Sequence, residues 1–173
     1  MEPVDLGLLI LRVVIGGTMF AHGGQKAWGW WHGPGYQTWS KIVEGMGFRP
    51  AGLFTVMSIA GELSGGFLVL GILTPLFATL VVGQAIVIIG KVHLAKGFWN
   101  KDSGYEFPLS LLAGAAAILL IGPGAVSLDA LIGFSMAPEW QAVLLAVAVV
   151  GGLVTLGLPK LTAGEPPTAA ASR

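Results

Sequence analysis

The chain contains no cysteine and few charged residues. Of its 173 residues, 54% are apolar and only 10% are Asp, Glu, Lys or Arg. A soluble domain carries about 25% charged residues, so this composition argues against an ordinary soluble protein and indicates a membrane protein. The lack of cysteine excludes disulfides, thiol–disulfide exchange by this chain, haem attached through CxxCH and iron–sulfur clusters held by cysteine. Redox chemistry would therefore need a bound cofactor or a partner protein.

Several functional motifs are also absent. The sequence has no glycine-rich phosphate loop, no dinucleotide fingerprint and no Ser nucleophile elbow. The net charge of zero says nothing about a nucleic-acid partner, because the basic residues, apart from Arg12, lie in predicted loops and ends. No nucleic-acid partner is expected for this membrane protein. The N-terminus has no basic region before its apolar run and no small-residue cleavage site. We therefore expect a retained first helix and not a signal peptide.

Five apolar stretches predict transmembrane helices, because about 20 residues rising about 1.5 Å each cross the hydrocarbon of a bilayer. They cover residues 5–26, 51–71, 75–92, 106–122 and 138–158. Residues 127–134 predict a short interfacial helix capped by Ser127. The expected fold is an all-α membrane protein, with a four-helix transmembrane bundle over residues 1–135 and a fifth C-terminal transmembrane helix over residues 136–159. A disordered tail is expected at 160–173.

The basic residues predict the orientation. Eight Lys and Arg residues lie in the connections 26–50 and 93–105, at the end of the span that leads into the second of these, or at the chain end: Lys26, Lys41, Arg49, Lys91, Lys96, Lys101, Lys160 and Arg173. The N-terminus and the other two connections have none. The positive-inside rule then places the two polar loops and the C-terminus in the cytoplasm and the N-terminus outside. The loop 26–50 also contains four Trp residues, so we expect it to lie at the membrane interface.

An acidic residue, Glu62, lies near the middle of the stretch 51–71. Central charges cost about 2.5 to 3.5 kcal/mol on insertion scales, so they normally face protein, water or a ligand. Small and polar residues share one helical face with it: Thr55, Ser58, Gly65 and Gly66. By helical rise Arg12 lies about 10 Å and Glu62 about 14 Å below the outer face, so the two could meet. Two interpretations stay open, a structural Arg12–Glu62 pair and a Glu62 that exchanges protons or hydrogen bonds with a quinone.

A second polar layer is expected at the cytoplasmic end. It contains His22, Gln25, Lys26, His93, Lys96, Tyr105 and Glu106. These residues could be interfacial anchors, and Ser103 with Glu106 fits a capping box. His22 or His93 could instead exchange protons with a quinone headgroup, because histidine titrates near neutral pH. His22, His93 and Glu106 have the ligand types of a two-His, one-carboxylate site, but they come from three separate segments, and no metal is expected.

Six motifs occur in an order that resembles the DoxX family of small bacterial membrane proteins. They are DLGLLILR from Asp5, AHGGQK at 21–26, GELSGG at 61–66, VHLAKGF at 92–98, GYEFPL at 104–109 and GPGAVSLDAL at 122–131. The resemblance implies a four-helix membrane bundle related to the DoxD-type subunit of thiosulfate:quinone oxidoreductase. It also implies that the family's recurrent polar positions correspond here to His22, Gln25, Lys26, Glu62, His93, Lys96, Tyr105 and Glu106. The fifth helix and the tail go beyond the usual family unit.

Residues and resemblance together predict a membrane subunit of a redox system, either quinone-linked thiosulfate or sulfur oxidation or an oxidative-stress complex. The expected catalytic groups are Glu62, His22, His93 and Glu106, and the expected quinone-binding groups are Arg12, Gln25, Lys26, Lys96 and Tyr105. The resemblance implies a soluble sulfurtransferase or superoxide dismutase as partner, beside membrane lipids; a homo-oligomer is also open. Whether the chain is itself an enzyme is left undecided.

Two alternatives belong to other functional classes. The first is a non-catalytic scaffold in the bacterial cell membrane that docks soluble partners through its cytoplasmic loops. The second is a transporter, which is less favoured because no broken helix is evident within the predicted spans.

Overall fold

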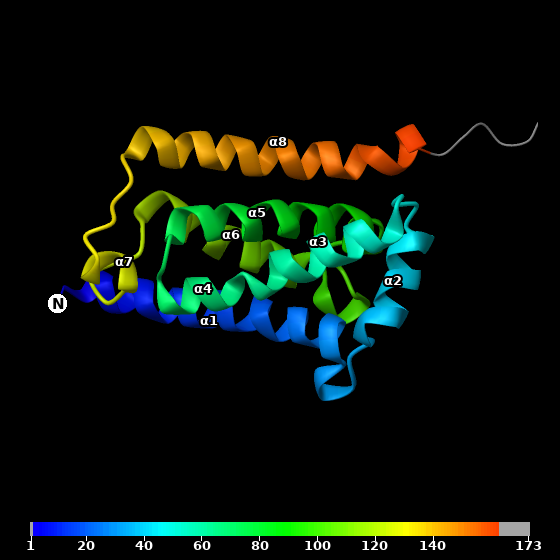
Figure 1. Ribbon diagram of the computed structural model, residues 1–173, viewed down its shortest axis with the longest axis horizontal. Helices are drawn as coiled ribbons and strands as arrows, with labels where there is room; N and C mark the ends of the chain where they lie inside the picture. The colour runs from blue at the N-terminus through cyan, green and yellow to red at the C-terminus, as the bar shows by residue number, and fades with distance from the viewer. Residues whose placement is uncertain (1, 163–173) are drawn as a thin grey trace, which may run out of the picture.

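The computed structural model describes residues 2–162, and this part of the chain is helical without strands. Five apolar segments run side by side in Figure 1. They are α1 (Pro3–Trp28), α3 (Ala51–Leu63) continued by α4 (Gly65–Leu70), α5 (Thr74–Ile88), α6 (Glu106–Ile121) and α8 (Pro138–Thr162). The predicted all-α membrane fold with a C-terminal spanning helix is therefore confirmed.

The described helices differ in length. Four segments are long and apolar enough to cross a membrane: Pro3–Trp28, Ala51–Leu70, Thr74–Lys96 and Pro138–Pro159. The helix α6 is shorter, with 16 residues, which corresponds to about 24 Å. It packs mainly against α5, with further contacts to α1 and α8. The fourth predicted span is thus a short apolar helix that packs against three longer ones.

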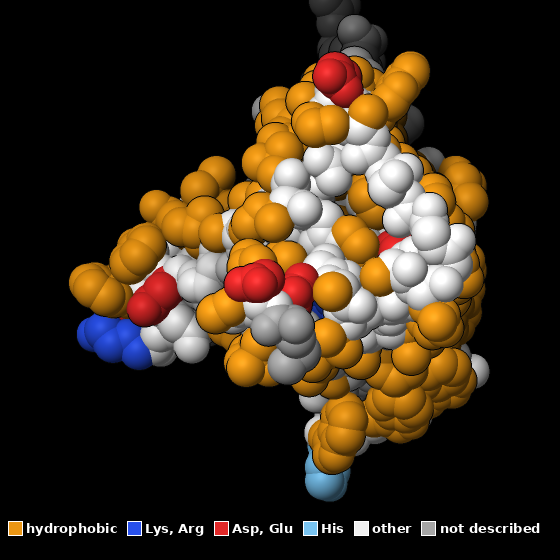
Figure 2. All heavy atoms as spheres, turned by 90° about the vertical axis from the view of Figure 1, so that its left-hand side faces the viewer, with side chains coloured by type: hydrophobic (Ala, Val, Ile, Leu, Met, Phe, Trp, Pro, Cys, Tyr) orange, Lys and Arg blue, Asp and Glu red, His pale blue; other side chains and the backbone are white. Residues whose placement is uncertain are grey.

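The hydrophobic core lies where α5 and α6 meet α1 and α8. Its fully enclosed side chains include Met19, Leu68, Val81, Ile118 and Leu119. Many of the outward-facing side chains are also apolar. Figure 2 shows such side chains at the end of the molecule that carries the N-terminus. A bundle that is apolar both inside and outside suits a lipid environment, where acyl chains replace water around it.

Glycines allow α1 and α4 to approach closely. A Cβ added to Gly16 would meet Leu68 Cβ at 3.0 Å and would come still closer to the backbone oxygen of Gly65. In lipid, helix association depends on such close van der Waals packing, because the acyl chains are as apolar as the side chains. The pair Gly16 and Gly65 therefore sets the contact between the first two spans.

The second span is interrupted at Ser64, between α3 and α4. The Ser64 hydroxyl donates to Gly61 O at 2.6 Å, and Gly65 and Gly66 follow. A serine that bonds its own backbone and a pair of glycines all weaken a helix locally. Ser64 nevertheless keeps helical dihedral angles, and its N–H bonds Ala60 O at 2.9 Å. The irregularity directly after Glu62 is therefore local, and Ala51–Leu70 remains one span.

The first polar connection is not a simple loop. It contains a 3₁₀ turn (Trp30–His32) and the helix α2 (Gly35–Gly45), so the expected loop 26–50 is corrected. Figure 1 shows α2 crossing one end of the bundle. Val43 of α2 is buried, whereas Lys41 and Glu44 are exposed. The helix α2 is therefore amphipathic: it packs its apolar face on the bundle and covers one end of it.

Beyond α5 the helix continues as a π-helical turn (Ile89–His93) and a 3₁₀ turn (Leu94–Lys96). A π-turn inserts extra backbone into the helix and changes the direction in which the following side chains point. Gly90 within this turn faces α8, since a Cβ there would come within 2.7 Å of Leu156. The end of α5 thereby packs against α8. A further 3₁₀ turn (Asn100–Asp102) precedes α6.

The opposite end is organised by α7 (Leu128–Leu131). The Ser127 hydroxyl accepts from Ala130 N at 3.1 Å, which confirms the predicted cap. Asp129 is completely buried and accepts from Leu73 N at 2.6 Å and from Thr74 N at 2.8 Å. This carboxylate therefore joins α7 to the start of α5. The helix α8 continues through Pro159 to Thr162, and residues 163–173 of the predicted tail lie outside the described residues.

Candidate functional site

Glu62 forms a buried ion pair with Lys26. The carboxylate Oε1 accepts from Lys26 Nζ, and the side chains are 1% and 13% exposed, respectively. The helices α1 and α3 run in opposite directions (Figure 1). Helical side chains lean toward the N-terminus of their own helix, so these two lean toward each other. The register agrees, because a Cβ on Gly23 would lie 2.8 Å from Leu63 N.

The predicted Arg12–Glu62 pair is wrong. The Arg12 side chain is 0% exposed, and its Nη2 donates to Val126 O at the other end of the bundle. It lies against Gly71, where a Cβ would overlap the guanidinium. The predicted pairing assumed that Asp5 and Gly71 lie at the same depth in the membrane. In the structure, Gly71 lies at the depth of the Arg12 guanidinium. Glu62, nine residues away from Gly71, therefore lies about 14 Å from that guanidinium along the bundle axis.

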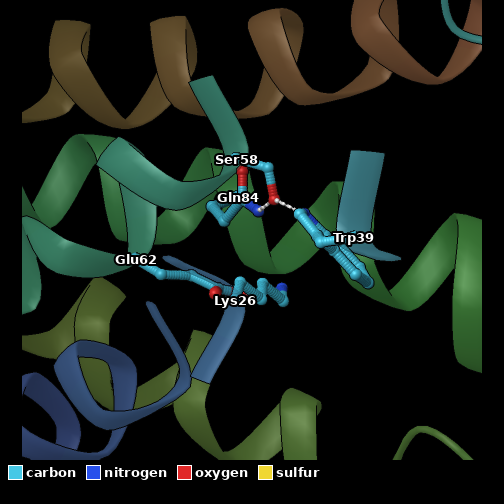
Figure 3. A network of polar contacts seen from close by, with 5 residues as sticks. All are labelled: Lys26, Trp39, Ser58, Glu62 and Gln84. Carbon is cyan, nitrogen blue, oxygen red and sulfur yellow. Dashed lines mark hydrogen bonds and ion pairs between the residues drawn. The ribbon is translucent and has the colours of Figure 1, made fainter. Parts of the chain in front are cut away.

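A second set of polar side chains lies behind the ion pair (Figure 3). Trp39 Nε1 of α2 donates to Ser58 Oγ at 3.3 Å, and Gln84 Nε2 of α5 donates to the same oxygen at 3.1 Å. Gln84 also packs against α3 next to Glu62, since a Cβ on Gly61 would lie 3.4 Å from Gln84 Oε1. Lys26 Nζ lies 4.1 Å from the centroid of the Trp39 ring. These contacts join α1, α2, α3 and α5 through one network.

Sequence reasoning missed the roles of Ser58 and Trp39. A signal for Ser58 was present, since it stands four residues before Glu62 and so shares its helical face. No comparable signal existed for Trp39, because it belongs to a segment that was expected to be an interfacial loop.

A cavity of about 330 Å³ opens on the other side of this network, between α2, α3, α5 and α8. Its walls are mostly apolar and include Phe54, Met57, Val87, Ile88 and Val147. Its polar edge consists of Trp39, Ser58 and Gln84, with Lys91 nearby on the π-turn. Apolar walls with a few convergent polar groups are typical of small-molecule sites.

Two threonines also line this cavity, but their hydroxyl protons are already used. Thr79 Oγ1 donates to Pro75 O at 2.7 Å, and Thr155 Oγ1 donates to Gly151 O at 2.8 Å. The hydrogen-bonding capacity of the cavity therefore lies at the edge next to Glu62 and at the ammonium group of Lys91, which also lines the cavity.

The remaining predicted residues form a separate group. His93 Nδ1 lies 2.7 Å from Ser103 O, Glu106 Oε2 accepts from Asn100 N at 2.9 Å, and the Tyr105 ring packs on Phe98 at 5.5 Å. The capping box predicted for Ser103 and Glu106 is wrong, because Ser103 has a φ of 62° and Glu106 instead caps the preceding turn. These residues hold the connection 97–105 against the start of α6.

The other residues of the polar layer that was predicted for the cytoplasmic end divide between the Glu62 network and this separate group. His22 is half-buried, with its ring 6.2 Å from that of Phe107, and it is close enough to Glu62 to act on its charge. Gln25 is half-buried against Gly33, and Lys96 is exposed. Among residues 2–162, no group of three His, Asp or Glu side chains is arranged to hold a metal ion, so the triad of His22, His93 and Glu106 has no geometric support.

Comparisons with known proteins identify the family. Neither the curated proteins nor the solved structures give a match to this chain. The family model described as DoxX matches residues 7–94, a range that includes Lys26, Ser58, Glu62 and Gln84, whereas α6, α7 and α8 lie beyond it. Because the match covers just over half of the 173 residues, the chain belongs to the DoxX family.

Proposed function

We propose that this protein is the ligand-binding membrane subunit of a redox system and that it holds a quinone in the cavity beside Ser58. The observation that carries the proposal is one apolar cavity of about 330 Å³ whose polar edge is backed by a buried ion pair. A bound quinone would supply an acceptor for two electrons and two protons. Small-molecule pockets usually have about 300 to 1,000 Å³, so the volume suits a quinone ring.

The donor set supports a ligand that carries acceptor oxygens. Trp39 Nε1 and Gln84 Nε2 both donate to Ser58 Oγ, which leaves the Ser58 hydroxyl proton as a donor at the polar edge. Quinone carbonyl oxygens are hydrogen-bond acceptors, and the ring and tail match the apolar walls. Trp39, Ser58 and Gln84 would hold the headgroup, and Phe54 and Met57 would contact its apolar part.

The Glu62–Lys26 pair would control charge and protons next to this cavity. Within the described residues, Glu62 Oε2 is buried without a hydrogen-bond partner. It is the atom that would take up a proton, and Lys26 balances the charge of the carboxylate before that uptake. Ionisable groups inside a membrane bundle commonly serve proton transfer. His22, one turn before Lys26 on the same face of α1, would exchange protons with this pair.

Electrons would come from a partner enzyme. The family resemblance suggests a sulfurtransferase or a superoxide dismutase, docked at the end that carries α2 and the connection 97–105. With the orientation that the basic residues favour, this end faces the cytoplasm of a bacterial cell. The competing function, a scaffold without a ligand, uses the same end and predicts an empty cavity.

The test uses the whole chain purified in mild detergent. We expect solvent extraction to recover a co-purified quinone with its characteristic absorbance. Gly151→Leu should abolish retention, because Gly151 lines the cavity and a Cβ there meets no described atom within 4 Å. Gly157→Leu is the matched control on α8, equally open at Cβ but outside the cavity.

Two outcomes would contradict the proposal. The first is a wild-type protein that neither contains quinone nor retains an added decyl-tailed benzoquinone; this result favours the scaffold. The second is equal retention by Gly151→Leu and Gly157→Leu, which would place any bound quinone outside the cavity.

A further inference from the structure

The Ser58 hydroxyl has one unused hydrogen-bonding function. A serine hydroxyl has one donor proton and two acceptor sites. Trp39 Nε1 and Gln84 Nε2 occupy the acceptor sites at 3.3 Å and 3.1 Å. The direction of the first bond is certain, because an indole N–H only donates. The hydroxyl proton of Ser58 is therefore the one hydrogen-bonding group of this side chain that remains to be assigned.

The direction of the second bond follows from the neighbours of Gln84. Its amide nitrogen lies 3.1 Å from Ser58 Oγ, and an amide nitrogen donates but does not accept. Its oxygen Oε1 points the other way, toward Gly61, 3.4 Å from where a Cβ would stand. Gln84 therefore donates to Ser58, and Ser58 does not donate to Gln84.

The usual acceptor for a helical serine is not used either. Serine and threonine inside a helix commonly donate to a backbone carbonyl one turn earlier. Thr55, Thr79 and Thr155 do so at 2.8, 2.7 and 2.8 Å, respectively. Ser58 forms no such bond within residues 2–162, and it lines the cavity. Its proton is available to an occupant of that cavity.

We infer that Ser58 donates this proton to a carbonyl oxygen of the cavity ligand and thereby makes the site select the oxidised, carbonyl form of its ligand over the reduced, hydroxyl form. The inference rests on the proposed function, since it specifies the ligand of the same cavity. A reduced ligand presents a hydroxyl proton that needs an acceptor. Ser58 cannot accept it, because Trp39 and Gln84 occupy both of its acceptor sites.

Binding of both redox forms tests the inference. The whole chain in lipid nanodiscs is titrated anaerobically with decyl-tailed benzoquinone and with its hydroquinone. We expect the wild type to bind the quinone more tightly, and Ser58→Ala to weaken quinone binding about tenfold, the effect of losing one hydrogen bond. Hydroquinone binding should weaken less, because the wild type already leaves the hydroquinone proton without an acceptor at Ser58. Ser110→Ala is the control, because that hydroxyl donates to Glu106 O on α6, away from the cavity.

Infrared spectroscopy gives a second readout. A hydrogen bond from Ser58 lowers the stretching frequency of the bound carbonyl, and Ser58→Ala should remove this shift. If Ser58→Ala does not fold, Ser58→Cys replaces it, with similar size but only a weak S–H donor.

The possible failures are distinguishable. If the wild type binds quinone but Ser58→Ala affects both redox forms equally or neither, the role of Ser58 is overturned and the quinone site stands. If the wild type binds neither form, the proposed function and this inference are both overturned.

Discussion

Lys26 of α1 neutralises Glu62 of α3 inside the bundle, where the carboxylate is only 1% exposed. The pair joins two spans that run in opposite directions, and it adjoins Gln84 and the cavity edge. Lys26 belongs to the last turn of α1, so the pair links the α2 end of the protein with its interior.

The first prediction concerns the stability of this pair. Lys26→Met should lower the free energy of unfolding by about 3 to 5 kcal/mol, because it leaves a buried carboxylate without its partner. The double variant Lys26→Met with Glu62→Gln should recover much of this loss. The measurement is unfolding of the purified protein in mixed detergent micelles, arranged as a double-mutant cycle.

The exposed pair Arg49–Glu44, at 3.3 Å and more than half exposed on both sides, is the control. Its removal should change the free energy of unfolding by less than about 1 kcal/mol. A Lys26→Met protein as stable as the wild type would show that the buried pair does not form.

The second prediction compares two adjacent glycines of α1. Gly16→Ala should destabilise the bundle by about 1 to 3 kcal/mol, because the new methyl group collides with Leu68 and the backbone of Gly65. Gly17→Ala should be neutral or stabilising by up to about 1 kcal/mol, since a Cβ there has no described neighbour within 4 Å and alanine favours helix. Thermal unfolding in one detergent measures both. Equal effects of the two substitutions would contradict the close α1–α4 contact.

The third prediction concerns Asp129. Asp129→Ala should cost about 1 to 3 kcal/mol, because it leaves the backbone N–H groups of Leu73 and Thr74 without their acceptor at the start of α5. Asp129→Asn, which keeps one acceptor oxygen, should cost less. Asp102→Ala is the exposed control. If Asp129→Ala unfolds at the same temperature as Asp102→Ala, the carboxylate does not cap α5.

The fourth prediction concerns orientation. Since the chain has no cysteine, a single introduced cysteine can be labelled with a maleimide without labelling of any native thiol. Asn100→Cys and Ala125→Cys place them at exposed positions in connections at opposite ends of the bundle. With the N-terminus outside, a membrane-impermeant maleimide should label Ala125→Cys in intact cells and Asn100→Cys only after permeabilisation. The reverse pattern would show that the protein is inserted the other way round.

Local properties of the sequence were enough to establish the class of the protein. Helices in lipid require a sufficient length of apolar residues, so each span could be predicted from its own segment. The cap at Ser127 was equally local, because the hydroxyl bonds the backbone three residues later. Six ordered motifs further sufficed to place the chain in its family, as the match over residues 7–94 confirms.

Contacts between helices were decided only by the tertiary structure. Depth along each helix suggested Arg12 as the partner of Glu62, but the partner depends on the register between two helices and on the direction in which their side chains lean. The same holds for Ser58, whose two donors come from α2 and α5. Composition and length thus determined a helical membrane protein, whereas the packing of separate segments determined which charge neutralises Glu62 and where a ligand can bind.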